Sequence, residues 1–433
     1  MSGRQPLTDP EIAHYFELVL GRAPENEAVV RHYAAMNLTP REFVRVLMES
    51  EEVAERYRRR LALAGMRDGG GARWPDGDGF PVLLFGAYGN GNLGDAAQAE
   101  AVAWLMQQWL PRTVSLAACS WERREAFAFP GAVLPSDALL RADMLPRSSP
   151  PASARGLVAI GGGGLFGTPH FPLCVAAWAE WLAGQGVPWV LLGVGGSAQS
   201  LRNPTWRPAY RVLFGQAAFV GVRDADTLAA VQAINPRAVW FPDPVLVRSL
   251  LAPEPEAADA EPRSIDALLI PRHPNGPADA AANQALLAWR DALVRSGSRV
   301  VVVAMERALD APALAGQDVV YVDDWSTLMR LCRQARLMAS LRLHGVVAGI
   351  AAGCVVHGLV QPKIGDLMQG LGIGAWFSAA GWPAGPPDLG AAAAARFHAA
   401  LAPHLRPWRA ATETAMREAG EAIRALTAAP KSG

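Results

Sequence analysis

The amino-acid sequence predicts an α/β protein in which two Rossmann-like domains face a cleft, preceded by a small all-helical domain. Short continuous apolar runs alternate with helical segments, a pattern typical of parallel sheets that are covered on both faces. These runs fall into two blocks separated by an acidic, proline-containing linker, and a stretch with purely helical spacing precedes them. A chain of 433 residues also exceeds what one hydrophobic core usually supports.

Three breaks in composition divide the chain. They are Met66–Gly79, rich in glycine and aspartate; Pro253–Ser264, which lacks apolar periodicity; and Pro383–Gly390, which precedes an alanine-rich stretch. We therefore predict a helical domain over residues 1–65, an N-terminal Rossmann-like domain over 80–252, a C-terminal Rossmann-like domain over 265–382 and a C-terminal helical segment over 391–428.

The apolar runs are the predicted strands of two parallel sheets. Those of the first block are Val82–Phe85, Leu157–Ile160, Trp189–Leu192 and Phe219–Val222. Those of the second block are Ala267–Ile270, Val300–Ala304, Val319–Val322 and Cys354–Val360. Two such blocks joined by a linker indicate an arrangement similar to that of glycosyltransferase-B enzymes, with the ligand in the cleft between the domains.

Charge and cysteine content exclude several classes of protein. Lysine plus arginine and aspartate plus glutamate number 40 each, so the chain lacks the basic field that nucleic acid would require, and no nucleic-acid partner is expected. The cysteines form no C-x-x-C pair, which disfavours a zinc site or a disulfide framework and favours a reducing cytosol. These cysteines are Cys119, Cys174, Cys332 and Cys354. We expect a cytoplasmic protein without a metal or a cofactor.

One apolar stretch, Leu343–Val360, is nearly long enough to suggest a membrane span. It contains His344 and His357 and is divided by Gly353, a residue suited to the end of a helix. We interpret it as a buried helix followed by a buried strand. The N-terminus, MSGRQPLTDPEIAHYF, lacks the continuous apolar core of a signal peptide.

Glycine-rich turns follow three of the predicted strands. In FGAYGNGNLGD the turn leads into a helix, where Asn92, Gly94 and backbone amides are placed to receive phosphate or carboxylate. Asp95 either caps this helix or faces the cleft as a hydrogen-bond acceptor or proton-transfer group. The turn IGGGGLF contains Gly162 and Gly163, and LLGVGGS is the third. All three lie at the carboxyl ends of strands, where open α/β sheets bind ligands.

Basic side chains occupy equivalent positions. Arg223 leaves a strand end in VGVRDAD, with Asp224 placed to cap the next helix, and can bind a carboxylate or phosphate in a bidentate manner. Arg342 and His344 begin the apolar helix of LRLHGVV, where an anion-binding or catalytic role and a purely structural one are both open. Further cationic candidates that follow strands are Arg272, with His273 beside it, and Lys363.

Taken in order, the motifs GNGNLGD, IGGGGLF, GVGGS, VRD, PDPV and RLHG, followed by a lysine after the last strand, resemble the polysaccharide pyruvyl transferase family. The similarity covers roughly Pro81 to Gly374. The segment VVHGLVQPKIGD lacks the aromatic residue that often accompanies the lysine in family members, and His357 within it suits a neutral core histidine. The N-terminal module resembles, more loosely, a short helical domain of bacterial proteins near surface-glycan assembly.

The resemblance implies transfer of a pyruvyl group from phosphoenolpyruvate to two hydroxyls of a glycan sugar, which gives a cyclic ketal and phosphate. It implies that Arg223 and Arg342 bind the donor's anionic groups, that His344 is the general acid, that Asp95 is a base toward the acceptor and that Lys363 assists the phosphate. No metal is required. The implied acceptor is a glycan or a lipid-linked oligosaccharide, and a lipid-linked acceptor would place the enzyme peripherally at the inner face of the membrane.

Two other functions stay open at this stage. A nucleotide-sugar glycosyltransferase shares the two-domain architecture and also needs cations. Glu306, after the Val300–Ala304 run, is a candidate for the ribose-binding carboxylate that such an enzyme would need. A non-catalytic glycan-binding protein is the other alternative, which the helical module and the 14 tryptophans could serve.

Overall fold

The computed structural model describes residues 7–16, 23–38, 42–43, 46–47, 50, 52, 80–88, 91–110, 114–120, 132–135, 156–166, 187–196, 201–202, 207–252, 263–274, 276–314, 316–380, 388 and 390–428. The predicted linker Met66–Gly79 and most of Pro253–Ser264 and Pro383–Gly390 lie outside these residues.

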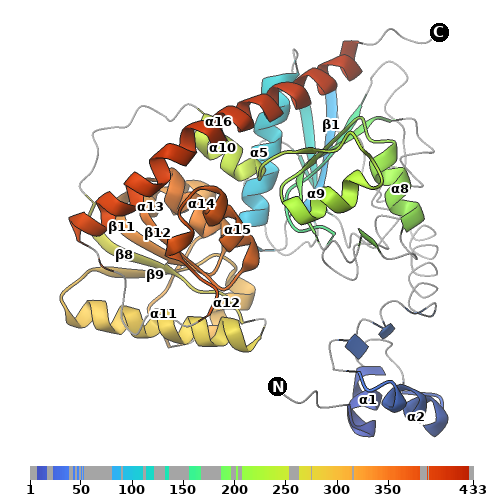
Figure 1. Ribbon diagram of the computed structural model, residues 1–433, viewed down its shortest axis with the longest axis horizontal. Coiled ribbons are helices and arrows are strands. Elements are labelled where there is room, and N and C mark those ends of the chain that lie inside the picture. Colours follow the sequence, from blue (N-terminus) through green and yellow to red (C-terminus); the bar gives the residue numbers. More distant parts are fainter. Residues whose placement is uncertain are drawn as a thin grey trace.

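The first sheet has seven parallel strands in the order β3-β2-β1-β4-β5-β6-β7 (Figure 1). Its strands are β1 (Phe80–Tyr88), β2 (Val114–Ser120), β3 (Ala132–Pro135), β4 (Leu157–Gly161), β5 (Trp189–Val194), β6 (Phe219–Val222) and β7 (Val239–Trp240). The helices of this half are α5 (Leu93–Trp109), α8 (Arg207–Gly215), α9 (Ala225–Gln232) and α10 (Pro244–Leu251). The chain reverses its direction of strand addition between β1 and β4, and such a switch point opens a crevice for ligands.

The second sheet has six parallel strands in the order β10-β9-β8-β11-β12-β13, which repeats the order of the first sheet over its first six strands. Its strands are β8 (Ile265–Ile270), β9 (Val300–Ala304), β10 (Val320–Tyr321), β11 (Ala335–Ser340), β12 (Val355–Leu359) and β13 (Phe377–Ser378). The helices are α11 (Pro277–Arg295), α12 (Arg307–Ala313), α13 (Trp325–Gln334), α14 (Leu343–Ala351), α15 (Pro362–Gly370) and the 3₁₀ turn η3 (Gly374–Trp376). The switch point lies between β8 and β11.

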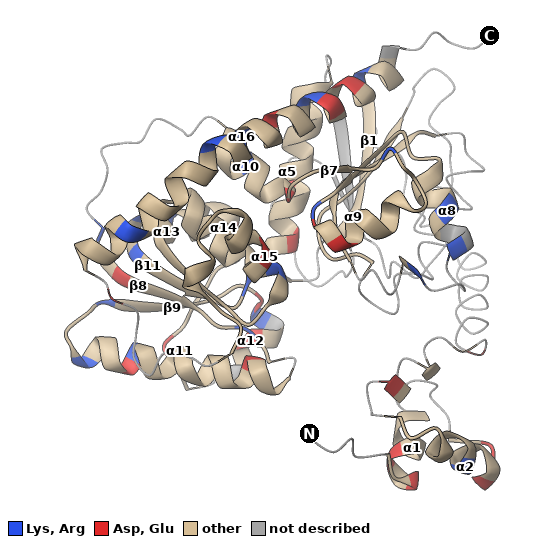
Figure 2. Ribbon diagram, in the orientation of Figure 1, with Lys and Arg blue, Asp and Glu red and all other residues tan. Residues whose placement is uncertain are grey.

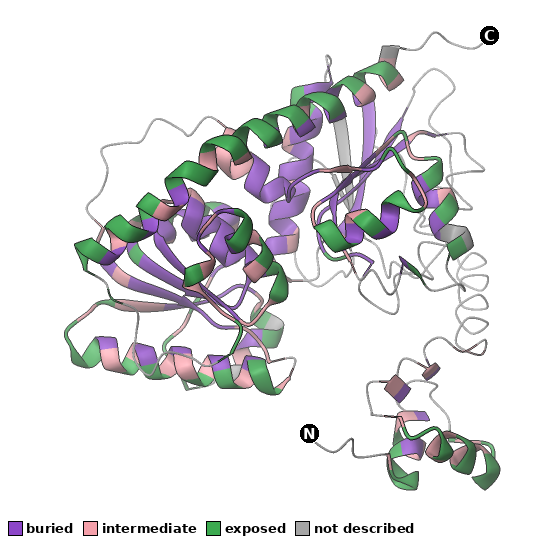
Figure 3. Ribbon diagram, viewed as in Figure 1, coloured by how far each residue is buried: buried purple, intermediate pink, exposed green. Residues whose placement is uncertain are grey.

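The two parallel sheets confirm the predicted pair of Rossmann-like domains. All eight predicted strands are present, because their apolar runs supply side chains to both faces of a buried sheet; β4 and β5 are buried along their whole length. The sheets are the most buried parts of Figure 3, whereas the outward faces of α11 and α16 are exposed. Figure 2 shows that basic and acidic residues intersperse along these outer helices.

The apolar stretch Leu343–Val360 is a buried helix, α14, followed by a buried strand, β12, as predicted. Gly353 lies between the two elements with a φ of 70°, a left-handed conformation that favours glycine. Among the described residues, no helix is both long and apolar enough to cross a bilayer.

Helix α16 (Ala391–Ala428) crosses both halves of the molecule (Figure 1). Phe397 and Leu401 belong to the core of the second sheet, whereas Ala419 and Ile423 pack into the core that contains β1 and α5. Gly420 lies so close to Trp109 of α5 that a Cβ atom there would be 2.7 Å from the indole. Helix α16 therefore packs directly against both domains and helps to hold them together.

The N-terminal region is helical where it is described. Helix α1 (Asp9–Tyr15) begins with a capping box in which Thr8 and Glu11 bond reciprocally, and Asn26 caps α2 (Glu27–Ala35). An aromatic cluster holds the helices together, with ring centroids of Phe16 and Tyr33 5.5 Å apart. A small helical region therefore precedes the two sheets.

We expect Gly420→Ala to destabilise the protein by about 1–3 kcal/mol, because the added methyl group overpacks the contact between α16 and Trp109. Thermal unfolding of the full chain measures the effect. Gly215→Ala is the matched control, since nothing lies within 4 Å of a Cβ atom at that helix end. Equal melting temperatures for the two variants would show that α16 does not pack tightly on α5.

Candidate functional site

A cavity of about 110 Å³ lies between the two domains, at the carboxyl ends of both sheets. The first sheet contributes the loop after β1, the loop after β4 and the residue that follows β6. The second sheet contributes the residues that follow β8, β9 and β11, and the first turn of α15. The lining residues are Asn92, Asp95, Gly163, Gly164, Arg223, Arg272, Met305, Glu306, Leu341, Arg342, Leu343, His344 and Lys363.

Asn92, and not Asp95, caps helix α5. The Asn92 side chain accepts a hydrogen bond from the Gly94 amide at 2.9 Å, and the helix begins at Leu93. The structural interpretation of Asp95 as the cap is therefore wrong, because Asp95 lies inside the first turn, where its carboxylate borders the cavity. The Leu93 amide donates to the Met305 carbonyl at 2.9 Å, which joins this helix start to the loop after β9 in the other domain.

Gly94 is the residue against which His344 packs. A Cβ atom at Gly94 would lie 2.0 Å from Nδ1 of His344, so any larger side chain would displace the imidazole. Gly94 is not among the residues that line the cavity, and its substrate-binding role stays a prediction.

The three glycine turns have different roles. Gly163 lines the cavity with a φ of 83°, whereas Gly162 packs against Gln98, whose Oε1 would lie 2.4 Å from an added Cβ atom. Gly193, within the last residues of β5, approaches Pro244, and a Cβ atom there would be 2.5 Å from the proline ring. This third turn therefore supports the loop that carries Asp243 and does not line the cavity.

Asp243 caps α10 and is the buried centre of a polar network. Its Oδ2 accepts hydrogen bonds from Arg223 Nη1 at 2.6 Å and from Gln98 Nε2 at 2.9 Å, and Oδ1 accepts from the Val245 amide at 3.0 Å. Nε2 of His344, from the other domain, lies 3.5 Å from Oδ2 and 3.2 Å from Gln98 Nε2. Burial acts to raise the pKa of Asp243, but His344 and Arg223 outweigh it and hold this pKa well below its usual range.

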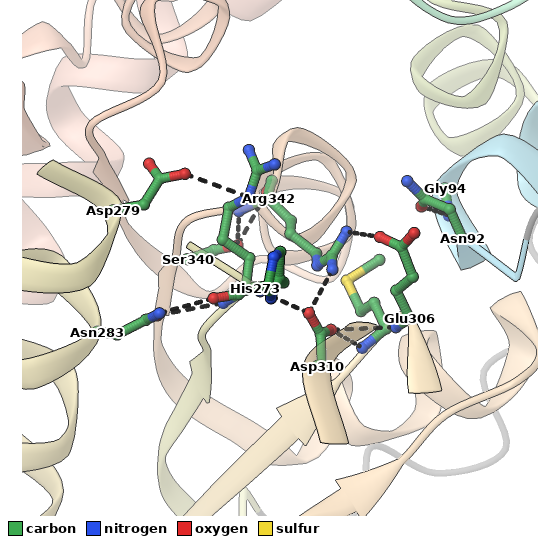
Figure 4. Close-up of polar contacts among 11 residues, drawn as sticks. Asn92, Gly94, His273, Asp279, Asn283, Glu306, Asp310, Ser340 and Arg342 are labelled. Atoms are coloured by element: carbon green, nitrogen blue, oxygen red, sulfur yellow. Dashed lines mark hydrogen bonds and ion pairs between the residues drawn. The ribbon is translucent and has the colours of Figure 1, made fainter. Parts of the chain in front are cut away.

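Arg342 is the N-cap residue of α14, and two carboxylates of its own domain bind it (Figure 4). Nη1 donates to Glu306 Oε2 at 2.9 Å, and Nη2 donates to Asp310 Oδ1 at 2.6 Å. Asp310 is fully buried and also accepts the backbone amides of His273 and Glu306. Burial raises the pKa of Glu306, Arg342 lowers it, and the net result is a raised pKa.

Two further cations complete the site. Arg272 Nε lies 3.6 Å from Asp279 Oδ2. The Asn283 side chain accepts a hydrogen bond from the Arg272 amide and donates one to the Arg272 carbonyl. Lys363 lies in the first turn of α15; loss of hydration and then repulsion from Arg223 lower its pKa to about 8, so it is mostly protonated at pH 7. Lys363 is nevertheless an exposed residue, so solvent screens part of the lowering of its pKa.

His357 lies apart from the cavity, in the core of β12. Its Nε2 is 3.1 Å from Ser378 Oγ, and its ring packs edge-on against Trp289. Burial lowers its pKa to about 4, as expected for a neutral core histidine.

The family follows from a comparison with known proteins. The model of the family described as polysaccharide pyruvyl transferase matches residues 92–361, more than half of the chain. The chain belongs to this family. The matched range includes each cavity-lining residue except Lys363.

Solved structures resemble the chain more distantly. A UDP-GlcNAc 2-epimerase from Neisseria meningitidis is 10% identical, with a TM-score of 0.44, over 79% of this chain and 98% of the epimerase. An α,α-trehalose-phosphate synthase from Burkholderia xenovorans is 12% identical, with a TM-score of 0.42, over 78% of this chain and 99% of the synthase. Among curated proteins, none matches the chain.

The cavity brings together most of the residues singled out from the sequence. Asn92, Asp95, Gly163, Arg223, Arg272, Arg342, His344 and Lys363 line it, whereas Gly94 and Gly162 lie behind its wall. The residues missed were Gln98, Asp243 and Asp310. For Asp243 a signal existed, because the aspartate before proline in PDPV is typical of a helix N-cap, and α10 begins there.

We expect Asp243→Asn to lower the stability at pH 7 by about 3 kcal/mol, because it leaves Arg223 buried without a carboxylate partner. The folded protein binds a proton at Asp243 less readily than the unfolded chain does. The stabilisation is therefore present above about pH 4 and is lost as the pH falls below it. Melting temperatures of the wild type and the variant should differ at pH 7, and the difference should shrink progressively as the pH falls below about 4. A difference that stays constant with pH would contradict this account, and the exposed Glu413→Gln is the control.

Proposed function

We propose that the protein transfers a pyruvyl group from phosphoenolpyruvate to two hydroxyls of a sugar in a surface or exported polysaccharide, forming a pyruvate ketal. The observation that carries this proposal is the convergence of Arg223, Arg272, Arg342 and Lys363 on one small cavity together with His344. Phosphoenolpyruvate carries a phosphate and a carboxylate on a three-carbon frame, and fixed cationic donors are the groups that bind such anions.

The donor is held in this proposal by residues of both domains. Arg342 and Arg223 bind its anionic groups, and Lys363 and Arg272 add further charge near the phosphate. Gly163 and Asn92 form the opposite wall, where the start of α5 adds the favourable end of its helix dipole. The small volume of the cavity suits this small donor, because it is far below the volume of roughly 300–1,000 Å³ that is typical of pockets for drug-sized ligands.

The chemistry assigned to the site adds one proton to the methylene carbon of the donor, removes the protons of two sugar hydroxyls and displaces one phosphate. His344 donates a proton to the methylene carbon of the donor while the oxygen of a sugar hydroxyl bonds to C2, and Asp95 accepts the proton of that hydroxyl. The C2–O bond to phosphate then breaks as phosphate leaves. The oxygen of the second hydroxyl bonds to C2 and passes its proton to the imidazole of His344, which closes the ketal, and Asp95 gives up its proton to the departing phosphate.

His344 is supported as the acid by its position between the domains. The Nδ1 side of the imidazole packs on Gly94, and its Nε2 lies near Asp243 and Gln98, so these contacts together fix the orientation of the ring. Asp95, in the first turn of α5, faces the same cavity from the other domain. We propose a glycan or a lipid-linked oligosaccharide as the acceptor, and a cytoplasmic reaction that takes place at the inner face of the membrane where the acceptor is lipid-linked.

The nucleotide-sugar alternative depended on Glu306 as a carboxylate for a ribose. Glu306 instead bonds to Arg342 at 2.9 Å, which leaves this carboxylate engaged with the site's own cation. The structure thus offers no observation at Glu306 that favours glycosyl transfer over pyruvyl transfer.

We expect Lys363→Ala to weaken phosphoenolpyruvate binding about 10- to 100-fold, the effect of losing one charged hydrogen bond to the donor. Calorimetric titration of the full chain measures this affinity. Arg336→Ala is the matched control, because Arg336 is an exposed cation of the same domain outside the cavity. Wild-type protein that binds a nucleotide sugar and not phosphoenolpyruvate would overturn the proposed function.

We expect Gly94→Ala to reduce phosphate release from phosphoenolpyruvate about 10²- to 10⁴-fold, because the methyl group displaces the proposed acid, His344. Binding of the donor should be weakened much less than turnover. Release is measured with a panel of pyranosides as acceptors, and Gly276→Ala, at a position with nothing within 4 Å of a Cβ atom, is the control. Undiminished turnover of Gly94→Ala would exclude His344 as the acid.

A further inference from the structure

Arg342 meets any incoming anion with both terminal nitrogens already bonded to carboxylates, and its buried Nε has no hydrogen-bond partner among the described residues. Nη1 bonds to Glu306 and Nη2 bonds to Asp310. Asp310 cannot readily leave, because it is fully buried and its two oxygens also accept the backbone amides of His273, Met305 and Glu306. Glu306 borders the cavity. An anion that enters from the cavity and takes the Nη1 donor therefore competes with Glu306, the partner of Arg342 that lines the cavity.

Glu306 stands in an environment that opposes its charge. Burial disfavours the carboxylate, and the carboxylates of Asp310 on α12 and of Asp95 on α5 repel it, while Arg342 attracts it. The other charged or titratable groups that line this cavity are Arg223, Arg272, Lys363 and His344, and of these Arg272 attracts Glu306 electrostatically. Arg342 is thus the main group that keeps Glu306 ionised.

We infer that Glu306 is a proton-coupled gate for the donor: phosphoenolpyruvate displaces Glu306 from Arg342, and Glu306 takes up one proton from solvent as it leaves. This inference rests on the proposed function, because it takes phosphoenolpyruvate as the anion. The donor's charge neutralises Arg342, and Glu306 then loses its principal attraction and gains a neighbouring negative charge. Its protonated carboxyl group donates a hydrogen bond toward the bound anion, where an ionised one would repel it.

Proton uptake on binding makes the affinity for the donor rise as the pH falls, until Glu306 is protonated in the free protein as well. The number of protons is measured by calorimetric titration of phosphoenolpyruvate into the full chain, in two buffers of different ionisation enthalpy at one pH. We expect the wild type to take up about one more proton per site than Glu306→Gln. Protons that the donor itself exchanges are common to both proteins and cancel in this difference.

The variant also separates a gate from a purely structural residue. Glu306→Gln keeps a polar side chain without the charge, so it should bind phosphoenolpyruvate more tightly than the wild type above neutral pH, whereas loss of a structural contact would weaken binding. Glu413→Gln, on the exposed surface of α16, should match the wild type in proton number and affinity.

Three outcomes are decisive. Equal proton numbers for the wild type and Glu306→Gln would overturn the inference and leave the proposed function standing. Absence of phosphoenolpyruvate binding by the wild type would overturn the proposed function, and the inference with it. If Glu306→Gln does not fold, infrared difference spectra of the wild type decide the matter: a protonated carboxyl band that grows when phosphoenolpyruvate is added supports the gate, and an unchanged band overturns it.

Discussion

The buried carboxylate of Asp243 is the group on which the geometry of the cleft depends. Taking an ion out of water costs several kcal/mol, so Asp243 can be buried only where donors surround it. Those donors come from separate parts of the chain: Arg223 follows β6, Gln98 lies on α5 and His344 lies in the other domain. Satisfying one charge thus fixes three elements relative to one another, and it orients the cation and the imidazole that border the cavity.

Strand order explains why these groups can meet. In each sheet the chain adds strands in one direction and then reverses, and the loops on either side of that switch point diverge to leave a crevice. Asn92 and Gly163 follow the two strands at the first switch point, and Arg272 and Arg342 follow those at the second. Because α10 and α14 pack together across the interface and α16 spans it, the two crevices form a single cavity. The similar halves supply different chemistry, since the first contributes the glycines of the cavity wall and the second most of the cations.

The sequence carried enough information for the sheets and for most of the cavity wall, because buried parallel strands need apolar runs and ligand loops follow their carboxyl ends. Strands β2, β3, β7, β11 and β13 were not among those predicted. For β11 the reason is physical: α13 ends at Gln334 and β11 begins at Ala335, without a turn residue to mark the boundary. Of the two roles left open for Asp95, the helix cap proved wrong, because Asn92, an equally good capping residue within the same turn, caps α5 instead. The role of Asp310 could not be predicted, because its partners are backbone amides and an arginine that only the folded chain brings together.

Pairing between charges was the least predictable property, and it changes how the site should be understood. Arg223, Arg272, Arg342 and Lys363 suggest a strongly cationic pocket, yet Asp243, Asp279, Glu306 and Asp310 lie against three of them, and Asp95 borders the same cavity. A multiply charged anion gains little from a site that is already neutral, unless one of the carboxylates gives up its charge. Burial alone does not decide which one, because it opposes the charge of both Asp243 and Glu306. The difference lies in their partners: Asp243 has Arg223 and His344, whereas Glu306 shares Arg342 with Asp310. Asp243 is therefore the permanent charge that holds the architecture, and Glu306 is the charge that can be neutralised when an anion arrives.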